Sequence, residues 1–538
     1  MDHLRISAIV RSRAKTAPHA TAFIQDNRSV SNADFADLVD RAASWLHANG
    51  IGRGDAVALW LVNSVEWLAL FAALARLRAI AVPINTRYRS EEVRHILAVS
   101  EARLLLTHGS YQRQGFLQIL GDIAAVDLPR LRGVALVNEP PHADAPACAW
   151  PLFHFNPSAA HAPQGADASD ALQPVVLFST SGTTKAPKLV VHPQRTLVDH
   201  ARRCAAVLGL SEPGAVLLAM LPMCGVFGLN SVLAALAGGA PVIVQAVFDA
   251  PAAAQLMMQH NVTHTFGSDE MFRRLDECVE GNAPFPAARF FGFGAFTSSF
   301  AELAQRCVGR GMPLHGLYGS SEVLALFSAQ PSTLPLAERL LGGGLPMSGT
   351  EVSIRVRDTA TGELLPAGAS GELEICAPNN FIGYFRDPGA TRESLSEGHF
   401  KTGDLGHLRP DGSFVFESRI GDAMRLGGHL VNPLELEEIM KRMDGVADAH
   451  VVASEVGGQP RAVAFVIPVG APAELADRLI YQLKDRVAGF KVPVRIWTID
   501  AFPETQGANG MKTSRVRLRQ MAQERIAAEN TAVKELPR

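Results

Sequence analysis

The chain has 538 residues, of which 47% are hydrophobic and 19% charged, so it can bury a sizeable core and is not globally disordered, collagen-like or of low complexity. Its 50 basic and 53 acidic residues give a net charge of −3. This balance provides no electrostatic footprint for nucleic acid or for an anionic membrane, and it favours a small-molecule partner.

The amino-terminal sequence lacks the pattern of an export signal, because its apolar run from Ile6 to Val10 is too short. The apolar stretch over 66–84 contains Arg76 and Arg78, so it predicts a helix followed by a strand instead of a membrane span. The six cysteines form neither a CxxC pair nor a zinc-binding spacing. We expect a cytoplasmic protein with reduced thiols, and the sequence leaves monomer and homodimer open.

The first 130 residues alternate between helical and strand patterns, which predicts a layered α/β domain. Apolar residues recur at helical spacing over 32–48, and the run ends at Asn49-Gly50, which is a helix stop signal. The other elements expected in this region are a strand over 56–61, a helix over 64–76 and a strand over 80–84.

Residues 138–172 show little periodicity and predict a surface loop, which leads into a strand over 174–178. Short alternating runs between turn signals predict a β-rich subdomain over about 350–417, with strands at 352–356, 371–376 and 413–416. From Gly421 onward the α/β pattern returns, which predicts a separate small domain. Its expected elements are helices over 433–442 and 473–487 and strands over 449–453, 462–468 and 495–498.

The strongest local motif is a polar loop that follows the strand at 174–178. It reads Phe178-Ser179-Thr180-Ser181-Gly182-Thr183-Thr184-Lys185-Ala186-Pro187-Lys188. Its hydroxyls, glycine and lysines offer hydrogen-bond donors and positive charge, which suit a polyphosphate. It is not a Walker A loop, because no GK[ST] opens a helix, and a Ser/Thr/Gly-rich turn alone is usually an ordinary surface loop.

Further motifs follow in a fixed order. They are Gly316-Leu317-Tyr318-Gly319-Ser320-Ser321-Glu322, then Gly383-Tyr384 with Pro388 and Thr391, then Thr402-Gly403-Asp404, and finally Arg419-Ile420-Gly421-Asp422 with Arg425 and Gly427-Gly428. Together with the polar loop they resemble the adenylate-forming (AMP-binding) superfamily, in its acyl-CoA synthetase and aryl-CoA ligase branch. The resemblance covers nearly the whole chain, and several motifs in one order are far more specific than any one alone.

The resemblance implies that ATP and Mg²⁺ bind at these motifs. Glu322 would be a catalytic residue and the magnesium ligand, because a hard cation prefers oxygen. Asp404 would accept hydrogen bonds from the ribose, Arg419 would bind ribose or phosphate, and Tyr318 would stack on adenine. The other residues that would bind ATP or coenzyme A are Thr180, Ser181, Gly182, Thr183, Thr184, Lys188, Gly319, Ser320, Ser321, Arg425, Gly427 and Gly428.

The carboxyl-terminal tail is similar to the family pattern P-x-T-x-x-G-K-x-x-R, with additional residues in the loop. It runs from Pro503 to Arg515 and has Met511 where glycine is usual. Lys512 still stands three residues before Arg515. The resemblance therefore assigns Lys512 the catalytic contact with the α-phosphate and the attacking carboxylate, where negative charge accumulates.

The segment Pro222-Met223-Cys224-Gly225-Val226-Phe227-Gly228 resembles the one in which many relatives carry a histidine or an aromatic gate beside the acyl pocket. Gly225 occupies that place and leaves space. We therefore expect a pocket that accepts an acid bulky near its carboxylate or of medium chain length. The residues assigned to this pocket are Cys224, Gly225, Phe227, Gly294 and Gly316.

The resemblance implies an α/β fold with a large N-terminal domain over 1–418, which binds ATP and the acid, and a small mobile C-terminal α/β domain over 419–538 with a hinge about Gly421. A carboxylic acid would attack the α-phosphate of ATP to give an acyl adenylate and pyrophosphate. The thiol of coenzyme A would then displace AMP. Such chemistry belongs to fatty acid or aromatic acid metabolism.

Other functions stay open. The acyl group could pass to a separate acyl carrier protein, or oxygen could be the second substrate. Lys185 and Leu189 replace glycines that are common in the phosphate loop, and a side chain costs about 1–2 kcal/mol wherever a positive φ is required. With Met511, these departures leave open a degenerate, non-catalytic adenylate-binding protein. The presence of Glu322, Asp404, Arg419 and Lys512 favours an enzyme.

Overall fold

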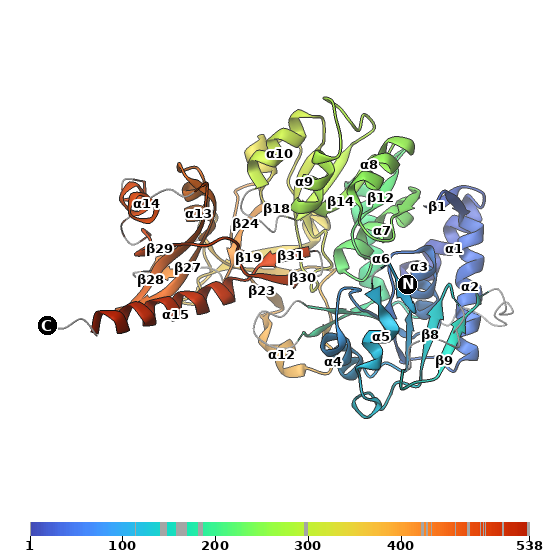
Figure 1. Ribbon diagram of the computed structural model, residues 1–538. Helices are drawn as coiled ribbons and strands as arrows, with labels where there is room; N and C mark the ends of the chain where they lie inside the picture. Colours follow the sequence, from blue (N-terminus) through green and yellow to red (C-terminus); the bar gives the residue numbers. More distant parts are fainter. Residues whose placement is uncertain are drawn as a thin grey trace. The chain divides into compact units, whose positions relative to one another are not determined.

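The computed structural model describes residues 2–534, except for positions 113, 140–147, 158–168, 181–186, 295–299, 421–423, 427–428, 432, 458, 471–473, 485, 488, 490 and 508–509 (Figure 1). The chain divides into two compact units. Unit 1 comprises Met1–Gly294, Arg306–Ser353 and Ile375–Phe400, and unit 2 comprises Ala295–Gln305, Ile354–Glu374 and Lys401–Arg538.

The first sheet of unit 1 has eight strands. In spatial order they are β21 (Gly383–Tyr384), β11 (Leu189–Pro193), β10 (Pro174–Ser179), β4 (Ile80–Pro83), β3 (Ala56–Trp60), β5 (Leu104–Thr107), β8 (Gly133–Val137) and β9 (Leu152–Phe155). The six strands from β10 to β9 are parallel, whereas β11 and β21 are antiparallel to their neighbours. The parallel strands read as continuous apolar runs because both faces of such a sheet are covered.

The second sheet of unit 1 also has a parallel centre. Its strands in this unit are β18 (Gly343–Pro346), β17 (Ser328–Ala329), β16 (Leu314–Tyr318), β15 (Phe290–Gly294), β14 (His264–Ser268), β12 (Leu217–Ala219), β13 (Val242–Val244), β1 (Thr21–Gln25) and β2 (Arg28–Ser31). The strands from β16 to β1 are parallel, and β2, β17 and β18 are antiparallel additions. The expected layered α/β architecture is confirmed.

Helices fill the spaces around these sheets. They are α1 (Ile6–Thr16), α2 (Asn32–Ala48), α3 (Val65–Arg76), α4 (Ser90–Ser100), α5 (Phe116–Gly121), α6 (Gln194–Val207), α7 (Val226–Gly238), α8 (Ala250–Gln259), α9 (Asp269–Glu277), α10 (Phe300–Gly309), α11 (Leu336–Arg339) and α12 (Pro388–Glu393). Every residue of α3 except Glu66 is buried, as expected of a helix that is apolar on all sides. The Ser31 side chain caps α2, and α6 packs on α7.

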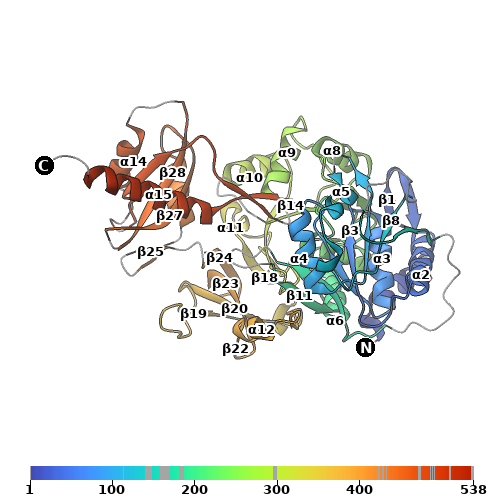
Figure 2. The same ribbon diagram turned by 60° about the horizontal axis from the view of Figure 1, so that its bottom comes forward.

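Unit 2 begins with the predicted β-rich part, which is visible in Figure 2 around β19, β20, β23 and β24. These strands span Ser353–Arg357, Gly371–Cys376, His399–Leu408 and Phe414–Arg419. The strands β23 and β24 are antiparallel, and their register places Asp404 opposite Arg419.

The rest of unit 2 contains a three-stranded sheet, β27-β28-β29, with helices on both faces (Figure 1), and two two-stranded sheets, β25-β26 and β30-β31. Its elements are β25 (Met424–Leu426), β26 (His429–Val431), α13 (Pro433–Lys441), β27 (Val446–Val456), β28 (Gln459–Pro468), α14 (Leu475–Leu483), β29 (Arg495–Thr498), β30 (Glu504–Gly507), β31 (Gly510–Thr513) and α15 (Arg515–Lys534). Residues 462, 464 and 466 pack with α13 and α14, whereas 463 and 465 pack with α15. This period of two follows from the alternation of side chains along a strand.

Nearly all predicted elements are confirmed, with one correction. The expected loop over 138–172 contains the edge strand β9, which pairs in parallel with β8. Its pattern is weak because Phe153 points outward and is 38% exposed. In the described part of the chain, no helix is both long enough and apolar enough to cross a membrane.

Candidate active site

The polar loop leaves the carboxyl end of β10 and returns along β11. Two hydrogen bonds join its ends: the Thr180 N–H donates to the Lys188 carbonyl at 2.9 Å, and the Lys188 N–H donates to Thr180 Oγ1 at 3.2 Å. Ser181, Gly182, Thr183, Thr184 and Lys185 lie outside the described residues. Leu189 pairs with Ser179 as part of β11 and is buried. It has extended backbone, so the strain considered for a side chain at this position does not arise.

A cation, a phenol and a carboxylate form a chain beside this loop. The Lys188 ammonium lies 4.7 Å from the centre of the Tyr384 ring, and the Tyr384 hydroxyl donates to Glu322 Oε1 at 2.9 Å. Glu322 is 9% exposed. Sequence reasoning assigned functions to Lys188 and Glu322, but it quoted Tyr384 only as part of a motif. In the structure, Tyr384 contacts both Lys188 and Glu322.

Glu322 lies in the connection between β16 and β17, which pair with Tyr318 opposite Ser328. The connection contains three consecutive residues with positive φ, Leu324 (64°), Ala325 (40°) and Leu326 (41°). Left-handed backbone costs roughly 1–2 kcal/mol for each residue that is not glycine. A Cβ on Gly319 would lie 2.5 Å from the Cα of Ala325, so this turn requires the glycine of the motif.

The neighbours of Glu322 supply further oxygen atoms. The Ser320 hydroxyl is buried and has no hydrogen-bond partner among the described residues. Tyr318, which was expected to stack on adenine, is 8% exposed, and its ring meets Phe327 edge-on at 6.3 Å between centroids.

Within the described ranges no cluster of three or more His, Cys, Asp or Glu side chains could hold a metal ion. One carboxylate with a nearby hydroxyl fits Mg²⁺, which is commonly held by one or two carboxylates together with substrate phosphates.

In unit 2, the Thr402-Gly403-Asp404 motif lies on β23 against the end of β24. Arg419 Nε is 2.9 Å from Asp404 Oδ1, and Asp404 is 2% exposed. The Thr402 hydroxyl donates to the Leu373 carbonyl at 2.7 Å and accepts the Asp404 N–H at 3.0 Å. The structure therefore brings together the two residues expected at the ribose, and Thr402 fixes the strand between them. Arg425 follows on β25, and Gly427 and Gly428 lie outside the described residues.

Lys512 lies on β31, opposite Thr505 of β30. The residues that follow it are anchored in the core of unit 2. Arg515 Nη1 is 2.7 Å from Oε1 of the fully buried Glu437, and His450 Nε2 lies 3.0 Å from the Thr513 hydroxyl. Burial alone would raise the pKa of Glu437, but the hydrogen bond with His450 and the charge of Arg515 outweigh it and lower the pKa to about 2. This network fixes the strand that carries Lys512.

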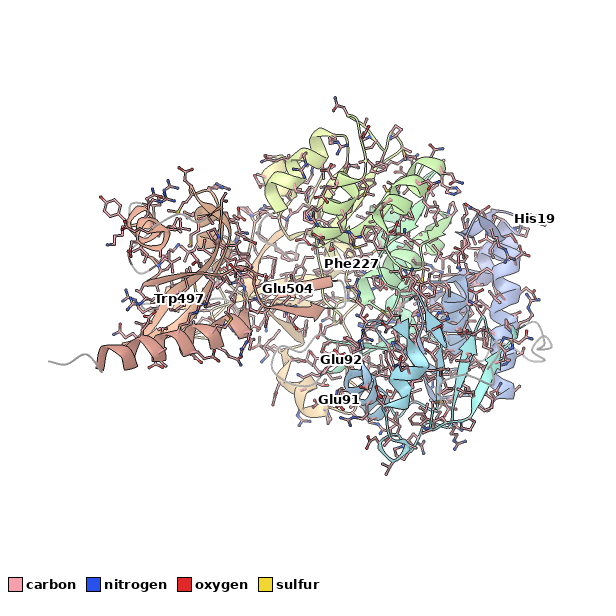
Figure 3. All side chains as sticks on the ribbon, in the orientation of Figure 1. His19, Glu91, Glu92, Phe227, Trp497 and Glu504 are labelled. Carbon is pink, nitrogen blue, oxygen red and sulfur yellow. The ribbon has the colours of Figure 1, made fainter. Side chains whose placement is uncertain are left out.

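The acyl-pocket candidates are placed around the start of α7 and the ends of β15 and β16. Gly225 is the residue before α7, and Phe227 on the first turn (Figure 3) meets Phe266 edge-on at 6.1 Å between centroids. Cys224 is close to the backbone of Thr86, and burial raises the pKa of its thiol to about 12. Gly294 ends β15. Gly316 lies in β16, where a Cβ would come within 2.2 Å of the Leu341 carbonyl, so packing alone requires a glycine there.

Tyr88 is a further residue that sequence reasoning missed near this pocket. Burial raises the pKa of Tyr88, and the Ser179 side chain at the end of β10 opposes this change. Cys224 also lies close enough to influence the ionisation of Tyr88. Tyr88 thus lies near both the base of the polar loop and the pocket candidate Cys224. Only its position after a strand end could have pointed to it.

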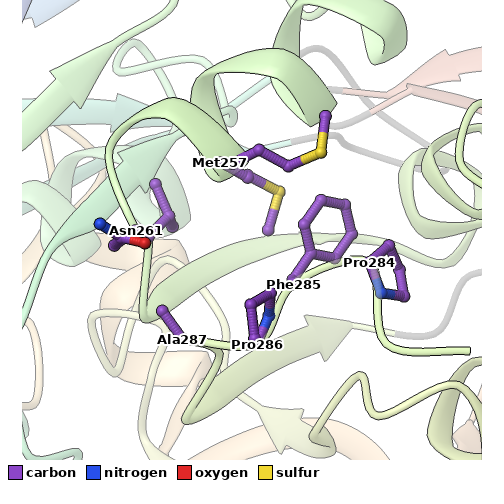
Figure 4. A pocket seen from close by; sticks show the side chains of 8 residues that line it. Met257, Asn261, Pro284, Phe285, Pro286 and Ala287 are labelled. Carbon is purple, nitrogen blue, oxygen red and sulfur yellow. The ribbon is translucent and has the colours of Figure 1, made fainter.

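A separate surface hollow of about 250 Å³ lies between the end of α8 and the segment before β15 (Figure 4). Met257, Pro284, Phe285 and Pro286 contribute most of its wall, and Asn261 is its main polar group. No titratable side chain lines it, so it offers nothing for phosphate or acid chemistry. The catalytic candidates therefore lie elsewhere, at the polar loop, the β16–β17 connection, β23–β24 and β31.

Comparison with known proteins shows the family to which a chain with these motifs belongs. The family model described as AMP-binding enzyme matches residues 10–385, and the AMP-binding enzyme C-terminal domain matches residues 435–509. The chain belongs to the AMP-binding enzyme family. Its Lys188, Glu322 and Tyr384 all lie within the larger match.

Curated relatives of this AMP-binding enzyme are CoA ligases, and the matches cover nearly the whole of both chains. The indoleacetate–CoA ligase of Aromatoleum aromaticum is 27% identical over 93% of this chain and 96% of its own. The feruloyl-CoA synthase of an Amycolatopsis species is 28% identical, with the same two shares of 93% and 96%. The long-chain-fatty-acid–CoA ligase FadD13 of Mycobacterium tuberculosis is 27% identical over 94% of this chain and 97% of its own.

Solved structures share the fold. ATP-bound MatB from Rhodopseudomonas palustris has a TM-score of 0.80 at 23% identity and covers 96% of this chain and 98% of that chain. MenE from Bacillus subtilis with ATP and magnesium has a TM-score of 0.76 at 23% identity, with shares of 92% and 96%. The chain is thus an AMP-forming acid–thiol ligase, which activates a carboxylic acid with ATP and forms the thioester of coenzyme A.

Proposed function

We propose that this AMP-forming ligase makes the coenzyme A thioester of an acid that is bulky near its carboxylate or of medium chain length. The observation that carries the assignment of its phosphate site is the chain from Lys188 through Tyr384 to Glu322 beside the closed polar loop. The Lys188 ammonium and the Glu322 carboxylate both contact the Tyr384 side chain. A cation and a carboxylate held in this way suit a polyphosphate with its divalent cation.

Each half of the chain contributes to adenylation. In unit 1, Glu322 and the Ser320 hydroxyl would hold Mg²⁺, which neutralises phosphate charge when bound. Lys188, Thr180, Ser181, Gly182, Thr183 and Thr184 would hold the β- and γ-phosphates, and Tyr318, Gly319 and Ser321 would line the adenine side. In unit 2, Asp404 and Arg419 would bind the ribose, and the Lys512 ammonium would stabilise charge at the α-phosphate as the carboxylate attacks.

The two half-reactions need different surfaces next to the same adenylate. We assign residues 1–418 to the domain that holds ATP and the acid and 419–538 to a mobile domain with its pivot at Gly421. In one orientation Lys512 meets the α-phosphate, and in the other Arg425, Gly427 and Gly428 line the route of the thiol. A glycine suits a pivot because it tolerates large changes of φ and ψ.

Gly225 has no side chain to narrow the entrance of the pocket, and this supports a bulky or medium-length acid as the substrate. Phe227 and Phe266 supply apolar walls. Relatives named for indoleacetate, ferulate and long-chain fatty acids are in keeping with this class. Apolar pockets discriminate by only about 1–3 kcal/mol per methylene group, so we expect a broad acid profile. The six free cysteines suit a reducing compartment that supplies ATP and coenzyme A, and we place the enzyme in the cytoplasm.

A panel of carboxylic acids tests this proposal. Pyrophosphate release is measured with ATP and Mg²⁺ for short, medium, long-chain and aryl acids, and thioester formation with coenzyme A or with a purified acyl carrier protein. We expect the highest kcat/KM for a medium-length or aryl acid with coenzyme A. Lys512→Ala is the control and should lower pyrophosphate release by about 10²–10³, the effect of losing one preorganised donor.

The outcomes separate the alternatives. Product only on the carrier protein would replace coenzyme A as the acceptor. Oxygen consumption without a thioester would point to an oxygen-dependent second step. Absence of pyrophosphate release for every acid, with ATP binding retained, would indicate a non-catalytic adenylate-binding protein. Preference for acetate over all larger acids would overturn the assigned acid class.

A further inference from the structure

The backbone around Glu322 is held by an unusual set of hydrogen bonds. Six consecutive carbonyl groups, those of residues 321–326, each accept a hydrogen bond from outside the connection. The donors are His192 Nε2 to Ser321 (2.8 Å), Phe381 N to Glu322 (2.7 Å), Asn379 Nδ2 to Val323 (2.5 Å), Asn230 Nδ2 to Leu324, His200 Nε2 to Ala325 (2.9 Å) and Cys204 Sγ to Leu326 (3.7 Å). We call these six donors the clamp.

The clamp gathers distant parts of unit 1 onto one short segment. His192 comes from β11, His200 and Cys204 from α6, Asn230 from α7, and Asn379 and Phe381 from the segment before β21. The side chains of His192, His200, Asn230 and Asn379 are at most 2% exposed. Each is a polar group removed from water, which is tolerated in a core only when it is hydrogen-bonded.

Local sequence does not account for the conformation that the clamp holds. Hairpin connections with positive φ favour Gly, Asn or Asp, whereas this one places Leu324, Ala325 and Leu326 in the left-handed region. Strained backbone of this kind persists where surrounding structure over-determines it, and such sites cluster at active centres. The bonds to residues 321–325 supply that surrounding structure, and they bracket Glu322 on both sides.

The histidines donate in their neutral form. Because a carbonyl only accepts, the proton of each ring must be on Nε2. Burial lowers the pKa of His192 to about 3 and that of His200 to about 4, so both rings are neutral at physiological pH and add no charge near the carboxylate. The segment is thus held by uncharged donors, which add no charge beside Glu322.

We propose that the clamp positions the Glu322 carboxylate for the divalent cation of ATP, with His192, His200 and Asn230 acting as positioning residues through the backbone of 321–325. This inference rests on the metal-binding role proposed for Glu322. Outer groups that orient a metal ligand commonly change metal affinity 10–100-fold when they are removed. Loss of a clamp donor should therefore weaken cation binding by at least about 10-fold, beyond any loss of stability.

The test uses Mn²⁺ as the probe and the full-length protein saturated with ATP. Mn²⁺ affinity is measured by electron paramagnetic resonance, and stability by urea unfolding. The variants are His200→Leu and His192→Leu, which remove a donor, and His200→Gln, which keeps an N–H group. Asn230→Leu serves as a further variant because α7 is apolar on all sides, so that the test stands if a histidine variant does not fold.

His264→Leu is the matched control. His264 is 1% exposed, and its Nε2 donates to the Leu208 carbonyl at 2.7 Å, so the variant removes the same kind of bond away from the β16–β17 connection. We expect weaker Mn²⁺ binding in His200→Leu, His192→Leu and Asn230→Leu, partial recovery in His200→Gln, and no change in His264→Leu at a similar loss of stability. Unchanged Mn²⁺ affinity in folded clamp variants would overturn the inference.

Glu322→Gln separates this inference from the function on which it depends. If Glu322→Gln leaves Mn²⁺ affinity unchanged, the metal-binding role of Glu322 is wrong. If it weakens Mn²⁺ binding while the clamp variants do not, the role of Glu322 stands and only the positioning inference fails.

Discussion

The phenol of Tyr384 is the residue-scale feature that connects the two charged groups of the proposed phosphate site. Its hydroxyl fixes one oxygen of Glu322, and its ring lies under the Lys188 ammonium. With the phenol between them, the two charges stay apart and both can meet a ligand.

Tyr384→Phe should reduce kcat/KM for MgATP by about 10- to 100-fold, because a hydrogen bond to a charged group is worth about 1.5–3 kcal/mol while the ring under Lys188 is kept. Pyrophosphate release over a range of MgATP concentrations measures the effect. Tyr481→Phe is the control, since Tyr481 on α14 is 71% exposed. Wild-type kinetics in Tyr384→Phe would show that the hydroxyl does not orient Glu322.

Gly225 is the residue whose small size we connect with acid choice. Gly225→His should raise KM most for the bulkiest accepted acids and leave the shortest ones little changed, because the imidazole would fill the space before α7. The measurement is kcat/KM over a chain-length and aryl series at saturating ATP. A uniform decrease for every acid would mean that Gly225 does not face the acyl group.

At the scale of elements, the strand that carries Lys512 depends on a buried ion network. Glu437 of α13 accepts the Val451 N–H of β27 at 2.8 Å and pairs with Arg515 at the start of α15. One carboxylate therefore ties the helix α13, the edge strand β27 and the segment after β31 together. Such a network stabilises the arrangement only while the carboxylate is charged.

The pH dependence of this network has a definite sign. Because the folded-state pKa of Glu437 is about 2 and its ordinary value is 4.5, the charged carboxylate stabilises the fold above about pH 4.5 and loses this contribution as the pH falls toward 2. The contribution is on the order of 3 kcal/mol. Glu437→Gln should lower the free energy of unfolding at pH 7 and flatten its dependence on pH between 4.5 and 2.

Urea unfolding at several pH values, followed by the tryptophan fluorescence of wild type and variant, measures this change. Trp497 is the sole tryptophan of residues 419–538, and its indole N–H donates to Glu529 of α15 at 3.1 Å. Glu455→Gln on the exposed end of β27 is the control. An equal slope with pH in Glu437→Gln and wild type would contradict the assignment.

For the whole molecule, sequence reasoning succeeded where the signal is local or periodic. The helix over 32–48 and the strands over 371–376 and 495–498 match the structure residue for residue. Lys188, Glu322 and Asp404 could be singled out because their motifs are contiguous, and their roles stay predictions. His192, His200 and Asn230 were missed, because their contacts join positions more than 90 residues apart. Three left-handed residues without glycine or asparagine also give no sequence signal.

Motion between the domains is the remaining prediction at this scale. Gly421→Pro fixes φ near about −65° and should trap one domain orientation. We expect one half-reaction to persist and the other to be lost. Pyrophosphate release reports adenylation, and thioester formation from presynthesised acyl adenylate reports the second half. Equal loss of both, with the circular dichroism spectrum of a folded protein, would argue against a pivot at this residue.

The environment of Cys224 has a consequence for chemical fidelity. A mixed anhydride of an acid and AMP acylates thiolates, and the enzyme must hold this intermediate until coenzyme A arrives. Cys224 is partly exposed, but desolvation raises the pKa of its thiol to about 12, so the thiol form prevails at neutral pH. A sulfur atom beside the candidate acyl pocket is thus a poor nucleophile. We therefore expect the intermediate to acylate Cys224 slowly and the activated acyl group to remain for its acceptor.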